Sequence, residues 1–133
     1  MPNKKGYSLL EVIIAVVIVS IIAALSLTYY NNIKEATLDK QAKADLKLLR
    51  SAQMSYKMDN NNVYYPSGGS SSNLGDINNN LKVNLPTAAT RAWNFRVWSS
   101  GCNRATRNGD NGRSWYLTIN DADGEPDAGA GCP

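Results

Sequence analysis

The order of apolar and polar residues predicts one long N-terminal helix with two different halves. Val12 to Leu27 reads VIIAVVIVSIIAALSL, which is apolar on every side of a helix. With its neighbours, roughly 20 residues can lie in hydrocarbon, enough to span a bilayer. Asn31 to Met58 is amphipathic, and no proline or glycine separates the two patterns. The pattern therefore predicts one helix from about Tyr7 to about Met58. Its second half has a stripe at helical spacing: Leu38, Ala42, Leu46, Leu49, Gln53 and Tyr56.

The rest of the chain predicts a small antiparallel sheet. RAWNFRVW at Arg91–Trp98 and SWYLTIN at Ser114–Asn120 alternate apolar and polar residues, as half-buried strands do. The turn-rich connection between them has room for a third short strand. Ile77–Leu85 predicts a short strand or turn, and the Ser/Gly/Asn-rich stretch before it and the C-terminal tail predict loops. The expected fold class is α+β, with the amphipathic half-helix packed on the sheet.

One carboxylate interrupts the apolar segment. Between Lys5 and Lys34 the only charged residue is Glu11. A carboxylate near the bilayer interior costs a few kcal/mol, so it needs a partner or a function. A buried core helix would need a larger domain around it, and a signal peptide cut near Ala24-Leu25-Ser26 would not ordinarily carry this charge. A plain membrane anchor, whose leading lysines keep the N-terminus cytoplasmic, leaves Glu11 unexplained.

A free α-amino group at membrane depth would be a suitable partner for this carboxylate. Cutting the chain between Gly6 and Tyr7 would create one. In a helical array of subunits, the new amine of one copy could meet Glu11 of a neighbour. The charge would then be paired in the assembly and costly in isolation.

The stretch KKGYSLLEV resembles the prepilin peptidase site of type IV pilins and of the pseudopilins of type II secretion. The resemblance implies cleavage after Gly6, N-methylation of the new terminus at Tyr7, and an assembly role for Glu11. It implies a leader at 1–6, a transmembrane and filament-core helix at 7–30, and a globular head at 31–133 that includes the amphipathic helix 31–58.

The chain also departs from that family pattern. Tyr7 replaces the more usual phenylalanine. Ser20 and Thr28 stand where many pilins have glycine and proline. The sequence therefore leaves open whether this part of the helix melts during assembly.

The resemblance implies a structural subunit of a type IV pilus filament. Its partners would be copies of itself, the prepilin peptidase, the inner membrane and the pilus assembly machinery. The precursor would lie in the bacterial inner membrane and the product in an extracellular pilus. One alternative is a pseudopilin in a periplasmic pseudopilus. Another, of a different class, is an uncut, single-pass anchored binding domain.

Enzymatic activity is not expected, because the chain has no histidine and no Gly-rich phosphate loop before a helix. The two cysteines, Cys102 and Cys132, are not spaced as a metal pair, and we expect a disulfide between them if the chain leaves the cytoplasm. It would stabilise the head by about 3.5–4 kcal/mol on the chain-entropy model.

The acidic tail offers one candidate metal site. Its carboxylates alternate along the chain, and calcium prefers six to eight oxygen ligands in such a loop. An ordinary acidic turn is the competing interpretation, because the glycine position differs from that of an EF-hand and no glutamate closes the loop. The candidate calcium ligands are Asp121, Asp123, Glu125 and Asp127.

Aromatic and basic residues gather around the predicted strands. The tryptophans suit the core, and a sugar-binding platform is the alternative. The arginines suit a solvated face, and a weak DNA-contact patch as in uptake pilins is the alternative. With the leader removed the net charge is 12 − 11 = +1, from 14 basic and 11 acidic residues less Lys4 and Lys5. We therefore expect no nucleic-acid partner. The residues concerned are Trp93, Trp98, Trp115, Arg91, Arg96, Arg104, Arg107 and Arg113.

Overall fold

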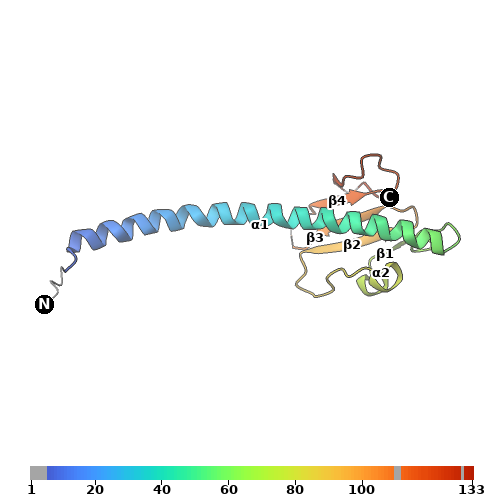
Figure 1. The fold of residues 1–133 in the computed structure, drawn as a ribbon, viewed down its shortest axis with the longest axis horizontal. Coiled ribbons are helices and arrows are strands. Elements are labelled where there is room, and N and C mark those ends of the chain that lie inside the picture. The colour runs from blue at the N-terminus through green and yellow to red at the C-terminus, as the bar shows by residue number, and fades with distance from the viewer. Residues whose placement is uncertain (1–5, 110–111, 130) are drawn as a thin grey trace. The chain divides into compact units, whose positions relative to one another are not determined.

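The computed structural model describes residues 6–109, 112–129 and 131–133 (Figure 1). The chain divides into two compact units, Met1–Thr37 and Leu38–Pro133. This division falls further along the chain than the boundary after residue 30 that the sequence predicts. The functional boundaries of leader, membrane helix and head stay predictions.

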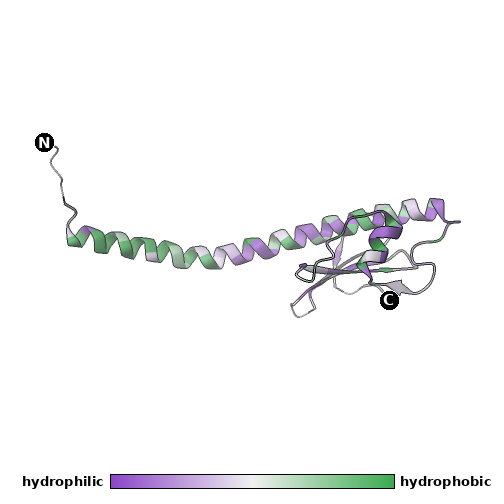
Figure 2. Cartoon of the chain, turned by 90° about the horizontal axis from the view of Figure 1, so that it is seen from below, coloured by the Kyte–Doolittle hydropathy of each residue, from purple (hydrophilic) through white to green (hydrophobic). Residues whose placement is uncertain are grey.

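Helix α1 runs from Leu9 to Asp59 and contributes to both units. Its ends lie close to the predicted ones at Tyr7 and Met58. The stretch from Ser20 to Thr28 is helical throughout in this structure. Figure 2 shows the change of character along the helix, which is continuously apolar near its N-terminal end and mixed further along.

The second unit carries a five-stranded antiparallel sheet in which each strand pairs with its neighbours in sequence (Figure 1). The α+β fold class is thereby confirmed. The third short strand for which the connection had room is present as β3. The strands are β1 (Ser70–Ser71), β2 (Trp93–Trp98), β3 (Asn103–Arg107), β4 (Ser114–Leu117) and β5 (Asp127–Ala128).

The sheet has one face toward α1 and an opposite face, which we call the outer face. Because side chains alternate along a strand, Phe95 and Val97 of β2 lie on the α1 side and Arg96 lies on the outer face. The register pairs Phe95 with Ala105 and Arg96 with Arg104. On the α1 side Trp93 donates its indole N–H to the carbonyl of Leu38 over 3.0 Å, which ties the sheet to the helix.

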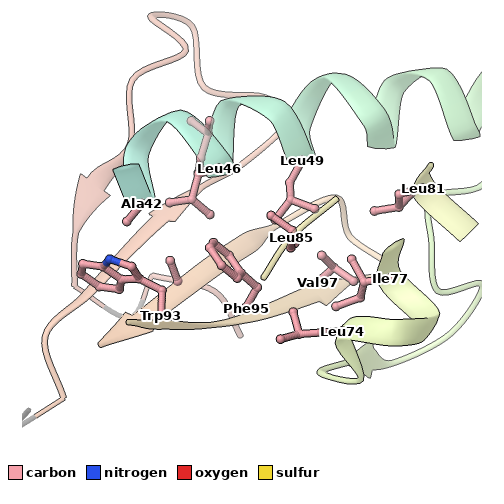
Figure 3. Close-up of a cluster of buried hydrophobic side chains, with 12 residues drawn as sticks. Ala42, Leu46, Leu49, Leu74, Ile77, Leu81, Leu85, Trp93, Phe95 and Val97 are labelled. Carbon is pink, nitrogen blue, oxygen red and sulfur yellow. The ribbon is translucent and has the colours of Figure 1, made fainter. Parts of the chain in front are cut away.

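The core lies between α1, the sheet and a second helix (Figure 3). Leu46 and Leu49 of α1 are fully buried against the sheet, as the predicted stripe requires. Burying each such side chain contributes about 1.5–3 kcal/mol. The buried cluster is Ala42, Leu46, Leu49, Leu74, Ile77, Leu81, Leu85, Trp93, Phe95, Val97, Ala105 and Leu117.

The prediction of a strand or turn at Ile77–Leu85 is wrong, because helix α2 (Leu74–Leu81) occupies this region. The side chain of Asn73 caps it by accepting bonds from the backbone N–H groups of Gly75 and Asp76. Leu74, Ile77 and Leu81 have the spacing of one helix face and are buried. The three asparagines between Ile77 and Leu81 have low helix propensity, and they hid this signal.

Short strands also occur where loops were predicted. β1 lies within the Ser/Gly-rich segment and pairs with the end of β2, through Ser70 opposite Trp98. β5 lies within the acidic tail and pairs with β4, through Asp127 opposite Tyr116. Each has two residues, too few for an alternating pattern to be visible in the sequence.

Candidate functional site

Gly6 and Tyr7 lie just before α1 in a non-helical, exposed stretch. A Cβ added at Gly6 would meet no atom within 4 Å, and Tyr7 is 83% exposed. The helix starts when the carbonyl of Ser8 accepts bonds from the N–H groups of Glu11 (3.0 Å) and Val12 (3.2 Å). The Gly6–Tyr7 peptide bond is thus outside the helical hydrogen-bond ladder and sterically open, as a protease substrate requires.

Glu11 lies in the first turn of α1. There the free N–H groups and the helix dipole favour a negative charge. Among the residues that the structure describes, Glu11 has no ion-pair or hydrogen-bonding partner. It lines a shallow hollow together with Tyr7, Val12, Ala15 and Val16. Tyr7 and Glu11 therefore lie at the same end of the helix, beside a surface with no covering group in the described part of the chain.

The apolar half of α1 is unburied along its whole length. Ile13 is 51% exposed and Leu25 is 71% exposed, and no residue of the 18-residue apolar stretch is buried. By length and composition α1 can cross a membrane, and it is the one described helix that can. So large an apolar surface is not stable in water without a partner.

The polar side chains within this apolar segment are satisfied by the helix itself. Ser20 donates to the carbonyl of Val16, and Ser26 donates to the carbonyl of Ile22, both over 2.7 Å. Such bonds remove the cost of a hydroxyl in hydrocarbon. Glu11 is left as the one charged group between Lys5 and Lys34.

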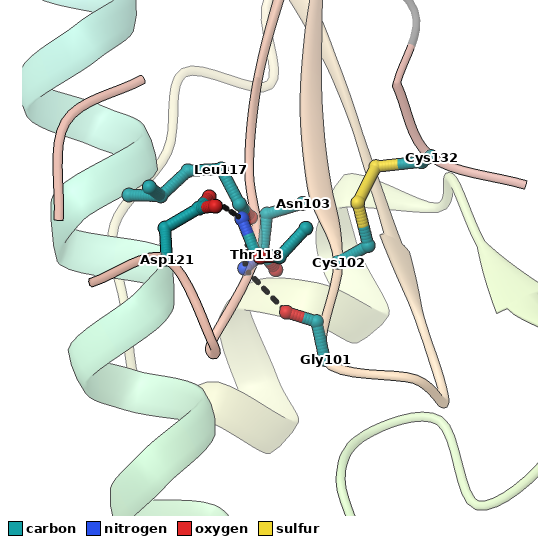
Figure 4. The surroundings of a disulfide bond; sticks show 7 residues. All are labelled: Gly101, Cys102, Asn103, Leu117, Thr118, Asp121 and Cys132. Atoms are coloured by element: carbon teal, nitrogen blue, oxygen red, sulfur yellow. Dashed lines mark hydrogen bonds between the residues drawn. A yellow bond between two sulfur atoms is a disulfide. The ribbon is translucent and has the colours of Figure 1, made fainter. Parts of the chain in front are cut away.

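The predicted disulfide is present. Cys102 and Cys132 are bonded, with their Cα atoms 5.8 Å apart and a sequence separation of 30 (Figure 4). The bond packs with Trp98 and Tyr116 on the outer face of the sheet. A Cβ at Gly131 would lie 2.2 Å from the Tyr116 ring, so the tail passes over the ring at a distance that only glycine permits.

The acidic tail loop is organised around two cations of α1. Arg50 donates to the carbonyls of Ile119 (3.0 Å) and Asp121 (2.9 Å), and Lys47 pairs with Glu125. Gly124 has φ +67°, and a Cβ there would come within 2.4 Å of the Arg50 guanidinium. The loop therefore wraps closely around Arg50.

The four candidate calcium ligands do not form a cage. Asp121 accepts a bond from the N–H of Thr118 at 2.8 Å, as Figure 4 shows, and Asp123 accepts one from the N–H of Glu125 at 3.1 Å. Asp127 is exposed in β5. Within the described part of the chain, no three acidic, cysteine or histidine side chains lie close enough together to hold a metal ion. Calcium binding stays a prediction that the structure does not support.

The tryptophans contribute to the cores and not to an open platform. Trp93 is 2% exposed and Trp98 is 9% exposed. Trp115 is partly buried against the main core, with the Lys43 ammonium 3.9 Å from its ring centroid. A flat sugar-binding surface needs exposed rings, which these side chains do not offer.

The five arginines separate into groups. Arg107 and Arg113 lie on the α1 side beside Trp93, and Arg113 also pairs with Asp39 at 3.2 Å. Arg91 bonds to Asn94 and to backbone carbonyls of its own loop. Arg96 and Arg104 are left together on the outer face.

Sequence reasoning missed the residues that hold the tail on the helix. Arg50 donates hydrogen bonds to backbone carbonyls 69 and 71 residues away, and contacts over such separations cannot be predicted from a local sequence pattern. It placed Gln53 on the apolar stripe but missed the two bonds of this side chain to the backbone of Tyr65. A polar residue on an otherwise apolar stripe was the available signal for that bond.

Together these features describe a protein with one exposed apolar helix that is long enough to cross a membrane, a carboxylate near its start that is unpaired among the described residues, and a disulfide-closed α+β head. Residues 1–27 match the family described as the prokaryotic N-terminal methylation motif, so the chain carries the prepilin-type signature of type IV pilins and pseudopilins. The motif implies processing by a prepilin peptidase and assembly into a pilus or pseudopilus. Comparison of the chain with curated proteins and with solved structures gave no match.

Proposed function

We propose that this chain is a structural subunit of a type IV pilus, with no catalytic role. The precursor enters the inner membrane through α1 and is cut between Gly6 and Tyr7. The Tyr7 amine is methylated, and the mature subunit then joins a helical filament whose interior is formed by the apolar half of α1. The head becomes part of the extracellular filament.

The observation that carries the proposal is the state of Glu11. It is an unpartnered carboxylate, among the described residues, on an exposed apolar helix, five positions after a sterically open glycine. A neighbour's free Tyr7 amine supplies the missing charge, and neighbouring helices cover the apolar surface. Both needs are met by one event, assembly after cleavage.

The apolar half of α1 suits both environments of such a subunit. Lipid tails and other apolar helices offer it similar contacts, because neither provides water or strong hydrogen bonds. The internal bonds of Ser20 and Ser26 are kept in either place. Transfer from membrane to filament therefore changes chiefly the surroundings of Glu11.

The first experiment measures the mass of the N-terminal peptide in two fractions of the native cells, sheared surface filaments and membranes. A methylated Tyr7 terminus in sheared filaments is the expected result. The same terminus found in membranes alone would replace the pilus with a pseudopilus or a minor subunit. A terminus at Met1 or Pro2 would overturn the proposal in favour of an uncut anchored domain.

A further inference from the structure

Two arginines lie directly opposite each other on the outer face of the sheet. The register pairs Arg96 of β2 with Arg104 of β3, and Tyr116 of β4 and Asp127 of β5 continue the row. Side chains in such positions have Cβ atoms about 4.5–5.5 Å apart, and like charges placed there destabilise the sheet. The chain therefore carries two like charges at directly opposite positions of the sheet.

No described carboxylate, Asp127 included, forms an ion pair with either arginine. Neither Arg96 nor Arg104 takes part in an ion pair or a hydrogen bond with any described residue. The Nε atom of Arg104 is buried and lacks a hydrogen-bond partner. The other arginines around the strands have partners, such as Asp39 for Arg113 and Asn94 for Arg91. The Arg96–Arg104 pair thus differs from them in having no hydrogen bond or ion pair at all among the described residues.

Both guanidinium groups lie over the ring of Trp98. Its ring centroid lies 5.0 Å from the Arg104 Cζ and 5.8 Å from the Arg96 Cζ. The ring itself is packed against the Cys102–Cys132 disulfide and Tyr116. Two forked donors are therefore held over one rigid aromatic support, an arrangement that costs little side-chain entropy when a ligand binds.

We propose that Arg96 and Arg104 form an oxyanion site that binds an acidic polysaccharide through its carboxylate or sulfate groups. The planar guanidinium fork matches such groups with two parallel hydrogen bonds. The ligand contacts the site through a single charged group, and it neutralises the repulsion between the two arginines.

The surroundings favour a polysaccharide over a nucleic acid. Single-stranded nucleic acids bind through bases stacked on open aromatic rings, whereas Trp98 is only 9% exposed. Duplex DNA is held by many phosphate contacts, whereas the outer face offers two unpaired cations among its described residues. A polymer needing one oxyanion per protein copy suits a pair of this size.

Assembly would strengthen a weak site of this kind. If the proposed filament forms, copies of the pair recur along it and meet the recurring charges of one polymer chain, which raises the overall affinity without new contacts. This strengthening rests on the proposed function, but the site itself belongs to the head. Binding by dispersed protein therefore tests the site even if no filament exists.

The experiment measures the binding of full-length protein, dispersed in a non-ionic detergent, to labelled polymers at low salt. The probes are polygalacturonate for carboxylate, dextran sulfate for sulfate, uncharged dextran, and duplex DNA. We expect binding to at least one acidic polysaccharide and none to dextran. The double variant Arg96→Gln/Arg104→Gln should raise the Kd about tenfold or more, as the loss of charge-assisted hydrogen bonds implies.

Two further variants separate a site from general attraction. Lys40→Gln/Lys82→Gln removes the same charge from exposed positions outside the outer face and should change the Kd by less than about twofold. Arg96→Lys/Arg104→Lys keeps the charge but loses the planar guanidinium groups that donate two parallel hydrogen bonds, and it should weaken binding several-fold. Because Arg96 is exposed, the single variant Arg96→Gln gives a readout if the double variant does not fold.

Several results would overturn the proposal. The first is an equal loss of affinity in Arg96→Gln/Arg104→Gln and in Lys40→Gln/Lys82→Gln. The second is an unchanged affinity in Arg96→Lys/Arg104→Lys. The third is that the wild type binds neither acidic polysaccharide. Tighter binding to DNA than to both polysaccharides, dependent on Arg96 and Arg104, would assign the pair to a nucleic acid instead.

Discussion

The side chain of Gln53 bonds to both backbone groups of Tyr65. Its Nε2 donates to the Tyr65 carbonyl over 2.6 Å, and its Oε1 accepts from the Tyr65 N–H over 2.9 Å. Gln53 is fully buried on the core-facing side of α1. The side chain of Gln53 therefore holds the segment that follows α1 against α1 itself. It also satisfies a backbone donor and a backbone acceptor that water cannot easily reach.

We predict that Gln53→Leu lowers the free energy of unfolding of the head by about 2–4 kcal/mol, because it leaves two backbone groups without partners. Denaturant unfolding of the full-length protein measures this. The matched control is Gln41→Leu, since Gln41 is an exposed residue of the same helix and its replacement should change stability by less than about 0.5 kcal/mol. Equal effects at the two positions would contradict the double bond to Tyr65.

Removing the disulfide should destabilise the head by about 3–4 kcal/mol, since its loop constrains the unfolded chain. Cys102→Ser and Cys132→Ser should have the same effect. Dithiothreitol should lower the stability of the wild type to that of the variants and leave the variants unchanged. A wild type that is indifferent to the reductant would show that the tail is held by its other contacts.

Gly131→Ala should cost about 1–3 kcal/mol, because the new methyl group would overlap the Tyr116 ring and force either the tail or the ring to shift. The double variant Gly131→Ala/Tyr116→Ala should show strong coupling between the two positions in a double-mutant cycle. Gly68→Ala serves as the control, because a Cβ there meets no atom within 4 Å. Additive effects of the two substitutions would argue against the close approach.

Asp45 predicts a pH dependence of head stability. It lies half-buried on α1, and loss of hydration raises the pKa of its carboxyl group above the ordinary 3.8. The folded state thus holds this proton more tightly than the unfolded state does, so the contribution of Asp45 to stability falls as pH rises from 3.8 through the raised pKa.

Asp45→Asn should therefore raise the stability at neutral pH, by at most about 1 kcal/mol because the group remains partly solvated. It should also remove this part of the pH dependence. Thermal unfolding from about pH 3.5, just below the ordinary pKa of an aspartate, to about pH 7 measures both effects. Greater stability of the wild type than of Asp45→Asn at neutral pH would show that the carboxylate has a favourable partner.

Glu11→Ala and Glu11→Gln should reach the membrane and be processed, yet assemble poorly. If each subunit loses even about 1.4 kcal/mol of pairing, the assembly equilibrium falls by about tenfold. The yield of sheared filaments measures the loss, and the N-terminal mass confirms processing. Lys34→Ala, an exposed charge beyond the apolar segment, is the control. Filaments at normal yield from Glu11→Gln would exclude pairing between this carboxylate and a neighbour's amine.

The sequence predicted those features that depend on local periodicity. The stripe from Leu38 to Tyr56 and the alternation in Trp93–Trp98 identify the surfaces that meet in the core, because burial selects for one face of a helix or strand. The candidate processing and assembly residues could also be identified from the sequence, because the leader charges, Gly6 and Glu11 lie within a few residues of one another. Their assigned roles remain predictions.

The remaining features depend on contacts between distant segments or on caps. Helix α2 was missed because its start depends on one side chain, Asn73, and its interior on asparagines that locally favour turns. The contacts of Arg50 with the tail, and the meeting of Arg96 with Arg104 across two strands, depend on strand register and chain path. The register of two paired strands depends on which side chains become buried when the strands meet, so it cannot be read from one stretch of sequence.

The two outermost strands of the sheet, Ser70–Ser71 and Asp127–Ala128, are only two residues long. An exposed strand edge offers free N–H and C=O groups on which another molecule's strand can pair, and its hazard grows with its length. In a filament, neighbouring heads would be held at very high local concentration, where edge-to-edge pairing would compete with ordered growth. Short edge strands leave little backbone for such aggregation, so the heads could be crowded together in the proposed filament while it grows through its N-terminal helices.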